Sequence, residues 1–220
     1  MKRTLAVLTG VLVALGGSAK TKGLDPLTLL KSKYKEMRGV IRKWGKDEHK
    51  MREELRKVMD TFVDFEELSK RTLPGTWDKL KKQQREEFVR EFKKMIQRTY
   101  ISKFHADQKF SIEYNGRVKY NKGKKQAYVS TTIRAGKSEA KVDYALYKRK
   151  GRWWAYDVII DDISLMKKYR RQFVRIVKRD GFETLLEKIK RRNKKREQEE
   201  QEEEQAKDSE TEEHQPDKGE

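Results

Sequence analysis

The fold of this chain is decided by residues 153–173, which read WWAYDVIIDDISLMKKYRRQF from Trp153 to Phe173. The first half is rich in β-branched and aromatic residues and predicts a buried strand. The second half changes to helical spacing, because Leu165, Tyr169 and Phe173 follow one another at intervals of four. A strand that leads directly into a helix, with aromatic side chains on both sides of the corner, can form two walls of a cavity.

Three further strands are predicted before this stretch, because apolar residues alternate with polar ones. Their apolar positions are Phe110, Ile112 and Tyr114, then Ala127, Val129, Thr131 and Ile133, then Ala140, Val142, Tyr144 and Leu146. We expect turns at Asn115-Gly116, around Gly136 and at Lys150-Gly151. Short turns between consecutive strands predict a four-stranded antiparallel sheet.

Helical patterns lie on both sides of these strands. A first helix is expected to begin at Asp25-Pro26, with Asp25 as N-cap. We expect its apolar stripe to pack on the core, and the stripe consists of Leu27, Leu30, Tyr34, Met37, Ile41 and Trp44. The expected helices that follow carry Met51, Leu55, Val58 and Phe62, then a capping pair at Asp64 and Glu67, then Phe88, Phe92, Met95, Ile96 and Phe104. After the strands, helices are expected from Ser164 to Lys178 and from Phe182 to about Arg192. Helices segregated before and after an antiparallel sheet define the class α+β.

Both ends of the chain differ in composition from its body. Lys2 and Arg3 precede an apolar run, Leu5 to Leu15, and then Gly17-Ser18-Ala19. This order predicts a secretory signal peptide at residues 1–19, too short to span a bilayer, rather than an uncleaved anchor. Residues 197–220 are acidic and contain no large apolar residue, which predicts a disordered tail. A single exported domain is therefore expected at residues 20–196.

The chain is strongly basic, with a formal net charge of +19. Twelve of its 36 acidic residues lie in 197–220, so the body is more basic still. Such a body attracts polyanions, either nucleic acid or an anionic membrane surface. The export signal favours the membrane surface and disfavours nucleic acid. The absence of cysteine excludes a disulfide framework and thiol chemistry.

Candidate catalytic residues are few. Ser164 and Lys167 match a Ser-x-x-Lys pattern of penicillin-recognising enzymes, but Ser164 directly precedes a helical run and is interpreted as an N-cap. Asp157, Asp161 and Asp162 could hold a cation or serve acid/base chemistry, yet helix capping and nearby Lys and Arg explain them equally well. The histidines are scattered, and His105 is interpreted as a helix-terminal residue. We therefore expect no catalytic residue, no metal site and no enzyme.

The aromatic residues of the last two strands have two interpretations. Tyr144, Trp153, Trp154 and Tyr156 could stack on nucleic-acid bases, as on single-strand-binding sheets. Aromatic residues at a period of two on a half-buried sheet more often line a core or a pocket. The pocket interpretation is favoured.

Three blocks of sequence carry a resemblance to a known family. They are Leu73–Trp77 with Gln84-Arg85, Phe88, Phe92 and Tyr100; Gly151–Asp157; and Ser164–Met166 with Tyr169-Arg170, Phe173 and Gly181. Through them the body, from about Leu24 to Arg192, resembles the MlaC family of periplasmic phospholipid-binding proteins, also described as a toluene-tolerance auxiliary component of an ABC transporter. One position departs from the family pattern, which has Gly where this chain has Asp162.

The resemblance implies that helices and sheet enclose an apolar pocket for the acyl chains of a diacyl phospholipid. It implies no cofactor, only this lipid cargo. It also implies shuttling between an outer-membrane lipoprotein complex and an inner-membrane ABC transporter with an MCE-domain component. The pocket residues expected on this basis are Leu73, Trp77, Phe88, Phe92, Tyr144, Leu146, Tyr156, Val158, Leu165, Tyr169 and Phe173.

Two other classes of protein remain open from the sequence. One is a basic nucleic-acid-binding domain with an aromatic sheet face. The other is a small cone-shaped α+β enzyme, which needs a carboxylate inside an apolar pocket, and Asp157 is the candidate for that carboxylate.

Overall fold

The computed structural model describes residues 23–105, 110–136 and 138–213; the predicted signal peptide lies outside them. Four α-helices precede the sheet, with a short 3-10 helix, η1, before the last of them. Their bounds are α1 Pro26–Trp44, α2 Glu48–Asp60, α3 Phe65–Thr72, η1 Trp77–Lys79 and α4 Lys82–Ile101. The sequence predicted all four α-helices, and these predictions are confirmed.

Aspartate side chains fix where the first helices begin. Asp25 Oδ1 accepts hydrogen bonds from the amides of Leu27 and Thr28, at 3.0 and 3.1 Å. Asp64 Oδ1 accepts from the amide of Glu67 at 3.0 Å, which confirms the predicted N-cap. The capping pair is not reciprocal, because the Asp64 amide donates to the Ala155 carbonyl at 2.8 Å. Asp64 thus joins the start of α3 to the sheet.

The sheet is antiparallel and follows chain order. It contains β1 Phe110–Tyr120, β2 Gln126–Ala135, β3 Ser138–Arg149, β4 Arg152–Ile160 and a two-residue β5, Ile163–Ser164. The four predicted strands are confirmed, and β5 is an addition. It forms because the chain turns back at residues 161–162 and pairs Ile163 with Ile160 before the next helix begins.

The turn predicted at Asn115-Gly116 was wrong. β1 continues through these residues, and its pairing with β2 shifts between Asn115 and Lys119. Gly116, at a φ of 71°, makes a bulge rather than a hairpin turn. The turn occurs at Asn121, whose side-chain oxygen accepts from the amides of Lys125 and Gln126 at 2.9 and 3.0 Å.

The C-terminal helix α5, Leu165–Glu213, consists of two arms that meet at Gly181. Gly181 has a φ of 84° and a ψ of 168°, a conformation that glycine adopts readily and other residues rarely. The break between two helices was predicted here. The end at about Arg192 was wrong, because the second arm extends to Glu213. Residues 197–213, which we expected to be disordered, are therefore helical.

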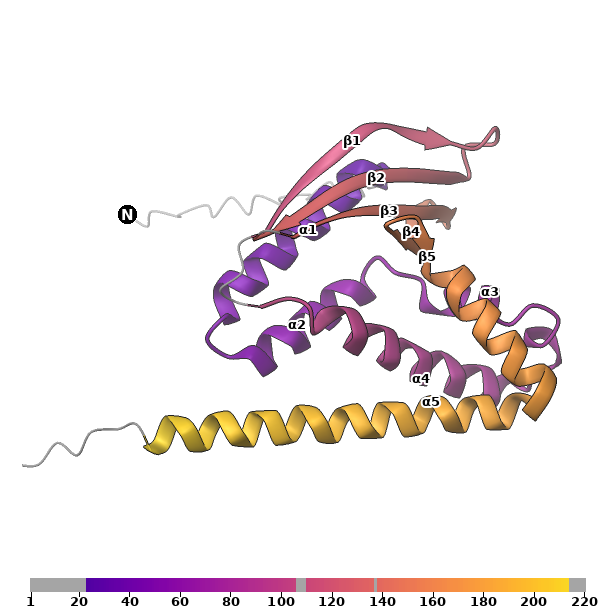
Figure 1. Cartoon of the computed structure of the whole chain (residues 1–220). Coiled ribbons are helices and arrows are strands. Elements are labelled where there is room, and N and C mark those ends of the chain that lie inside the picture. Colours follow the sequence, from indigo (N-terminus) through magenta and orange to yellow (C-terminus); the bar gives the residue numbers. More distant parts are fainter. Residues whose placement is uncertain (1–22, 106–109, 137, 214–220) are drawn as a thin grey trace, which may run out of the picture.

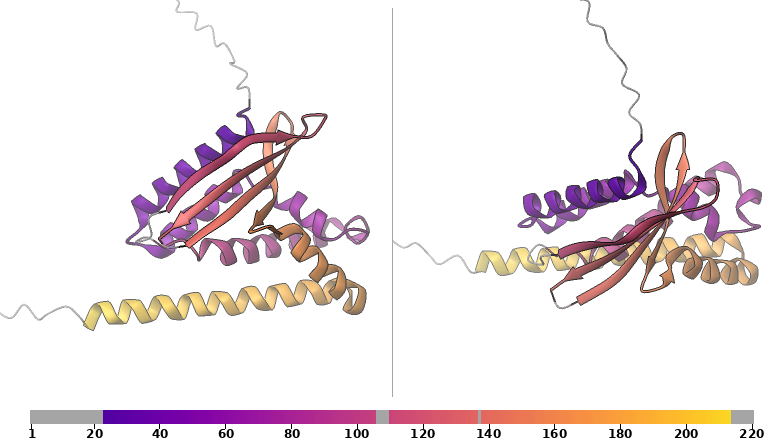
Figure 2. Two further views of the ribbon diagram at one scale, coloured as in Figure 1. Left: turned by 45° about the horizontal axis from the view of Figure 1, so that its top comes forward. Right: turned by 90° about the horizontal axis from the view of Figure 1, so that it is seen from above.

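The elements form layers, with the twisted sheet on one side and helices on the other (Figures 1 and 2). Below the sheet in Figure 1 lie α2 and α4, and the second arm of α5 runs along the far side of α4. An aromatic cluster joins α4 to the first arm of α5. Phe92 contacts Phe173 and Tyr169, with ring centroids 5.1 Å apart in both pairs.

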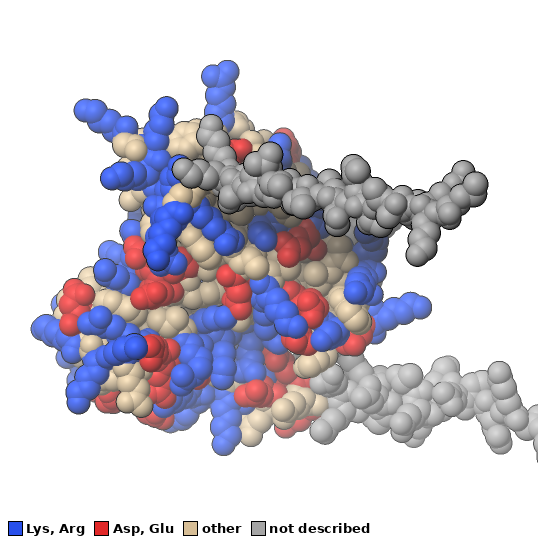
Figure 3. Space-filling model, turned by 180° about the vertical axis from the view of Figure 1, so that it is seen from behind, with Lys and Arg blue, Asp and Glu red and all other residues tan. Residues whose placement is uncertain are grey.

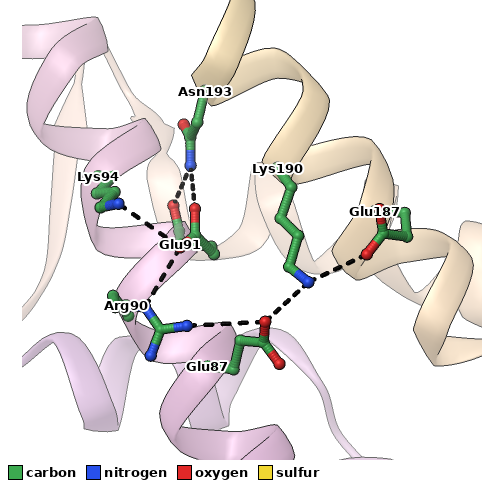
Figure 4. Close-up of polar contacts among 7 residues, drawn as sticks. All are labelled: Glu87, Arg90, Glu91, Lys94, Glu187, Lys190 and Asn193. Atoms are coloured by element: carbon green, nitrogen blue, oxygen red, sulfur yellow. Dashed lines mark hydrogen bonds and ion pairs between the residues drawn. The ribbon is translucent and has the colours of Figure 1, made fainter. Parts of the chain in front are cut away.

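The second arm of α5 is held to α4 by polar contacts (Figure 4). Asn193 is buried and donates to the Glu91 carbonyl and to Glu91 Oε2, at 2.9 and 3.0 Å. Lys190 pairs with Glu87 at 2.7 Å. Further along, Arg98 pairs with Glu197 at 3.1 Å, so the arm stays on α4 beyond Arg192.

Across the described ranges, no helix has the length and apolar composition that a membrane crossing requires.

Candidate functional site

A cavity of about 780 Å³ lies between the inner face of the sheet and the helices. Its wall is overwhelmingly apolar. The apolar and aromatic lining residues are Leu30, Tyr34, Met37, Met59, Phe62, Val63, Leu68, Ile96, Tyr100, Ile101, Phe104, Phe110, Ile133, Ala135, Ala140, Val142, Tyr144, Tyr156, Val158, Ile160, Ile163 and Leu165. A volume of this size is typical of ligand pockets.

The strand register decides which sheet residues face this cavity. Tyr144 on β3 lies opposite Val158 on β4, and Val142 lies opposite Ile160. Paired residues share a face of the sheet, so these four side chains point to the same side. A register shift at Ala145 leaves Tyr156 as an extra residue, and this bulge adds Tyr156 to the cavity wall.

The helical wall comes mainly from α1 and α4. Leu30, Tyr34 and Met37 lie on one face of α1 because they are three or four residues apart. Ile96, Tyr100 and Ile101 belong to the last turns of α4. The apolar stripe of α1 was predicted as core, and its place on a cavity wall was not foreseen.

Two tyrosine hydroxyls form the polar pair inside this wall. Tyr34 of α1 and Tyr144 of β3 hydrogen-bond to each other. Burial raises the pKa of Tyr144 to about 12. Burial, followed by the charge of Tyr144, also raises the pKa of Tyr34 well above its usual value. Both hydroxyls therefore stay neutral at physiological pH.

The mouth of the cavity lies at the β2–β3 end of the sheet. Exposed lining residues gather there, namely Lys103, His105, Ser138, Glu139, Asp161, Ile163 and Lys168. Ile163 is 55% exposed, so an apolar side chain borders the opening. The mouth carries charges of both signs, with basic groups from the end of α4 and the start of α5. His105 lies 3.4 Å from Glu48, beyond the end of α4 as expected.

The corner between β4 and α5 is held by Asp157. One carboxylate oxygen accepts from the Ser164 hydroxyl at 2.6 Å, and the other accepts from the Met166 amide at 3.0 Å. Ser164 Oγ in turn accepts from the Lys167 amide at 3.0 Å, which confirms its role as N-cap. Burial raises the pKa of Asp157, although these hydrogen bonds oppose the shift. Both oxygens thus have structural partners.

The tight turn before β5 uses two aspartates in a left-handed conformation. Asp161 and Asp162 have φ values of 46° and 63°. Asp161 exchanges two hydrogen bonds with Lys141, and Asp162 forms an ion pair with the same lysine at 2.9 Å. Aspartate tolerates this region better than most residues, so the turn forms without a glycine.

The structure separates the expected pocket residues into two groups. Tyr144, Tyr156, Val158 and Leu165 line the cavity. The other seven are Leu73, Trp77, Phe88, Phe92, Leu146, Tyr169 and Phe173, and they are buried in the packed core outside its lining. Phe88 and Phe92 pack against Phe173 in the first arm of α5, with ring centroids 5.7 and 5.1 Å away, and not into the cavity.

Metal chemistry has no candidate in the described part of the chain, where no group of three or more His, Asp or Glu side chains could hold an ion. The aromatic residues of β4 do not form a stacking platform. Trp153 is buried, and the guanidinium groups of Arg149 and Arg152 lie over the Trp154 ring, 5.5 and 4.3 Å from its centroid.

Comparison with known proteins identifies the family of this chain. The family model described as MlaC protein matches residues 35–191. The chain belongs to the MlaC family. The MlaC match begins inside α1 and ends in the second arm of α5, so it includes every cavity-lining residue except Leu30, Lys33 and Tyr34. None of the curated proteins matches the chain.

A solved structure supports the MlaC fold. It is that of a phospholipid-binding protein from Ralstonia solanacearum in complex with a phospholipid, and it aligns with a TM-score of 0.71 at 19% identity. The alignment covers 79% of this chain and 99% of that one. The MlaC family match ends at residue 191, so the helical residues 192–213 lie beyond it.

Proposed function

We propose that this chain is a lipid carrier that holds the acyl chains of a diacyl phospholipid in the cavity between its sheet and helices. The apolar cavity of about 780 Å³ is the observation that carries the proposal. Membership of the MlaC family supports it, as does the phospholipid in the structurally similar Ralstonia protein. The residues we assign to lipid contact are Tyr144, Tyr156, Val158 and Leu165, with Leu30, Met37, Ile96 and Ile101 opposite them.

Transfer of the acyl chains from water into this cavity supplies the binding free energy. Each methylene group contributes about 0.8 kcal/mol when it leaves water, so two long chains are retained strongly. The headgroup then lies at the mouth, among Lys103, His105 and Lys168. Release needs a partner that binds an open state of the cavity better than the closed one, because only such a difference shifts the equilibrium.

We place this carrier in the periplasm, exported by the signal peptide at residues 1–19. In this role it moves phospholipid between an outer-membrane lipoprotein complex and an inner-membrane ABC transporter with an MCE-domain component. Anionic membrane surfaces are the third expected partner, because the chain has a net charge of +19. The acidic end of α5 reduces that attraction in our proposal.

Native mass spectrometry of the protein, purified from the periplasm without detergent, tests the carrier function. We expect adducts with phospholipid masses that disappear on organic extraction and return when lipid is added. A bare protein mass that persists after addition of anionic and zwitterionic phospholipids would overturn the proposal.

An enzymatic role at the same cavity is less well supported. Asp157, the carboxylate that such a role requires, uses one oxygen for Ser164 and the other for Met166. Its two hydrogen bonds hold the start of α5 against β4. Asp157 does line the cavity, and each of its oxygens can accept a further hydrogen bond. The two bonds that it accepts nevertheless orient it toward the start of α5, which favours a structural role.

A further inference from the structure

The end of the sheet opposite the cavity mouth carries a dense group of basic side chains. Its members are Arg117, Lys119, Lys122, Lys124, Lys125, Lys148 and Lys150, and we call this group the basic tip. They come from the β1–β2 turn and the β3–β4 turn, which the antiparallel register brings to the same end. In Figure 3, Lys and Arg side chains project from the upper left, where the β1–β2 turn lies.

The charges of the basic tip are not neutralised by neighbours. All seven side chains are exposed, and none takes part in an ion pair within the described ranges. No acidic residue occurs between Tyr114 and Ser138, or between Tyr144 and Tyr156. By contrast, Lys and Glu alternate on the helices, where exposed pairs such as Lys57 with Glu53 are common.

Asp25 lies near Tyr120 and Asp64 near Arg149 at this end of the sheet, and both carboxylates are engaged. Asp25 caps α1 through the amides of Leu27 and Thr28. Asp64 caps α3, binds the Tyr147 hydroxyl and pairs with Arg149 at 3.0 Å. Neither is free to neutralise the lysines of the turns.

Apolar groups accompany these charges. Tyr120 is 43% exposed, and its ring packs 5.9 Å from that of Trp153. Leu24 is 49% exposed and follows Gly23, which lies against the Gly151 backbone at the same end of the sheet. Lysines beside an exposed tyrosine and leucine suit the headgroup region of a bilayer, where amphipathic rings and long basic chains are favourable.

We propose that the basic tip docks the protein on the anionic phospholipid surface of a membrane, with the cavity mouth directed away from that surface. β2 has ten residues, so the tip and the mouth are separated by roughly 30 Å. This distance is about four Debye lengths at physiological salt, so the mouth lies beyond the reach of the surface charge. Docking thus holds the carrier near a membrane and leaves its mouth free for a partner protein.

The proposal assigns the membrane attraction named above to a definite surface, and it is independent of the lipid cargo. Membrane docking by the basic tip does not depend on lipid in the cavity. An experiment can therefore contradict the docking proposal without contradicting the lipid-carrier proposal, and the reverse. Mass spectrometry of the cargo, made on the same samples, reports on the cavity, whereas vesicle binding reports on the tip.

Binding of the mature chain, residues 20–220, to vesicles tests whether the basic tip docks on an anionic membrane. The vesicles contain phosphatidylglycerol in phosphatidylcholine, or phosphatidylcholine alone. The tip variant is K119Q/K122Q/K124Q/K125Q, and the control K79Q/K82Q/K194Q/K195Q removes the same charge from exposed lysines elsewhere. Each tip lysine contributes about fivefold at an anionic surface, so we expect the tip variant to bind at least about 100-fold more weakly and the control to change far less. Equal losses in both variants would overturn the proposal, because net charge alone would then explain binding.

Orientation gives a second readout. The chain has no cysteine, so a single G123C or S138C carries one environment-sensitive fluorophore. A Cβ at Gly123 meets nothing within 4 Å, and Ser138 is exposed beside the mouth. We expect phosphatidylglycerol vesicles to change the emission of the label at 123 and leave the label at 138 unchanged. A response at 138 alone, or no vesicle binding at low salt, would overturn the proposal; in the second case an acidic protein surface becomes the partner that fits the tip.

Discussion

The hydroxyl groups of Tyr34 and Tyr144 meet across the cavity and join α1 to β3. Their rings are nearly perpendicular, at 81°, with centroids 6.3 Å apart. Both residues are buried in a wall that otherwise offers little polar surface, so each hydroxyl satisfies the other. This pair therefore holds the helical wall and the sheet wall at a fixed separation.

Removal of one hydroxyl of this pair should cost more than removal of both. Tyr34→Phe leaves the buried Tyr144 hydroxyl without its partner, so we expect the free energy of unfolding to fall by about 1–3 kcal/mol. The double variant Y34F/Y144F leaves neither group unpaired and should be closer to the unsubstituted protein. Urea denaturation of both variants measures the difference; equal losses would show that the hydroxyl pair makes no contribution.

The same pair makes stability depend on alkaline pH. Burial raises the pKa of Tyr144 from near 10 to about 12, so the folded state keeps a proton that the unfolded chain releases. This contribution is complete below pH 10 and is lost as the pH rises through about 12, which amounts to about 3 kcal/mol. Urea denaturation at several pH values measures this slope. Y34F/Y144F should lose less stability across that interval.

A bulky residue in the cavity should displace the cargo. Ala140 lines the cavity from β3, so Ala140→Trp places an indole in the space that we assign to acyl chains. We expect the fraction of lipid-bound protein in native mass spectra to fall at least about tenfold while the protein stays folded. Tyr128→Trp is the control, because Tyr128 is 41% exposed and does not line the cavity. Full lipid occupancy in A140W would place the lipid elsewhere.

Among the polar contacts that hold the second arm of α5 to α4, the buried Asn193 should contribute most to stability. Asn193→Ala removes two hydrogen bonds to Glu91, and we expect a loss of about 2 kcal/mol in the free energy of unfolding. Lys190→Ala, one turn earlier, removes more exposed ion pairs and should cost less than Asn193→Ala. Thermal or urea unfolding of the two variants checks the order, and a larger loss in K190A would contradict it.

The left-handed turn before β5 predicts a distinct mutational pattern. Asp162→Val places a β-branched residue at a φ of 63° and should destabilise the protein by about 1–3 kcal/mol. Asp162→Gly removes the cost of the left-handed backbone conformation but also removes the ion pair with Lys141. We therefore expect the free energy of unfolding to change by no more than about 1 kcal/mol. Comparison of the two variants by urea denaturation separates backbone conformation from charge. Equal stabilities would show that the conformation carries no cost.

Local chemistry made much of the fold predictable. Asp25 and Asp64 cap their helices as expected, and a strict period of two marks the strands, because these features depend on residues a few positions apart. The hairpin turn predicted at Asn115-Gly116 was wrong because that prediction also used local sequence alone. The dipeptide favours a hairpin turn locally, yet β1 gains more pairing with β2 by continuing as a bulge to Tyr120.

The cavity was harder to predict than the fold. Spacing identifies an apolar face but does not say whether that face meets another element or an empty space. Phe88 and Phe92 were expected in the pocket and instead pack against Phe173 in the first arm of α5. Tyr34 was assigned to the core, and only the tertiary arrangement places it opposite Tyr144.

The contact between Glu91 and Asn193 also affects how the protein can fold. These residues are 102 positions apart, so α4 gains this partner only after nearly the whole chain has been synthesised. Contacts of such long sequence separation slow folding, because the entropy of closing the loop is lost before the contact forms. The layer of α4 and the second arm of α5 therefore depends on a distant partner, whereas each strand of the sheet pairs with a neighbour that follows it closely in the chain.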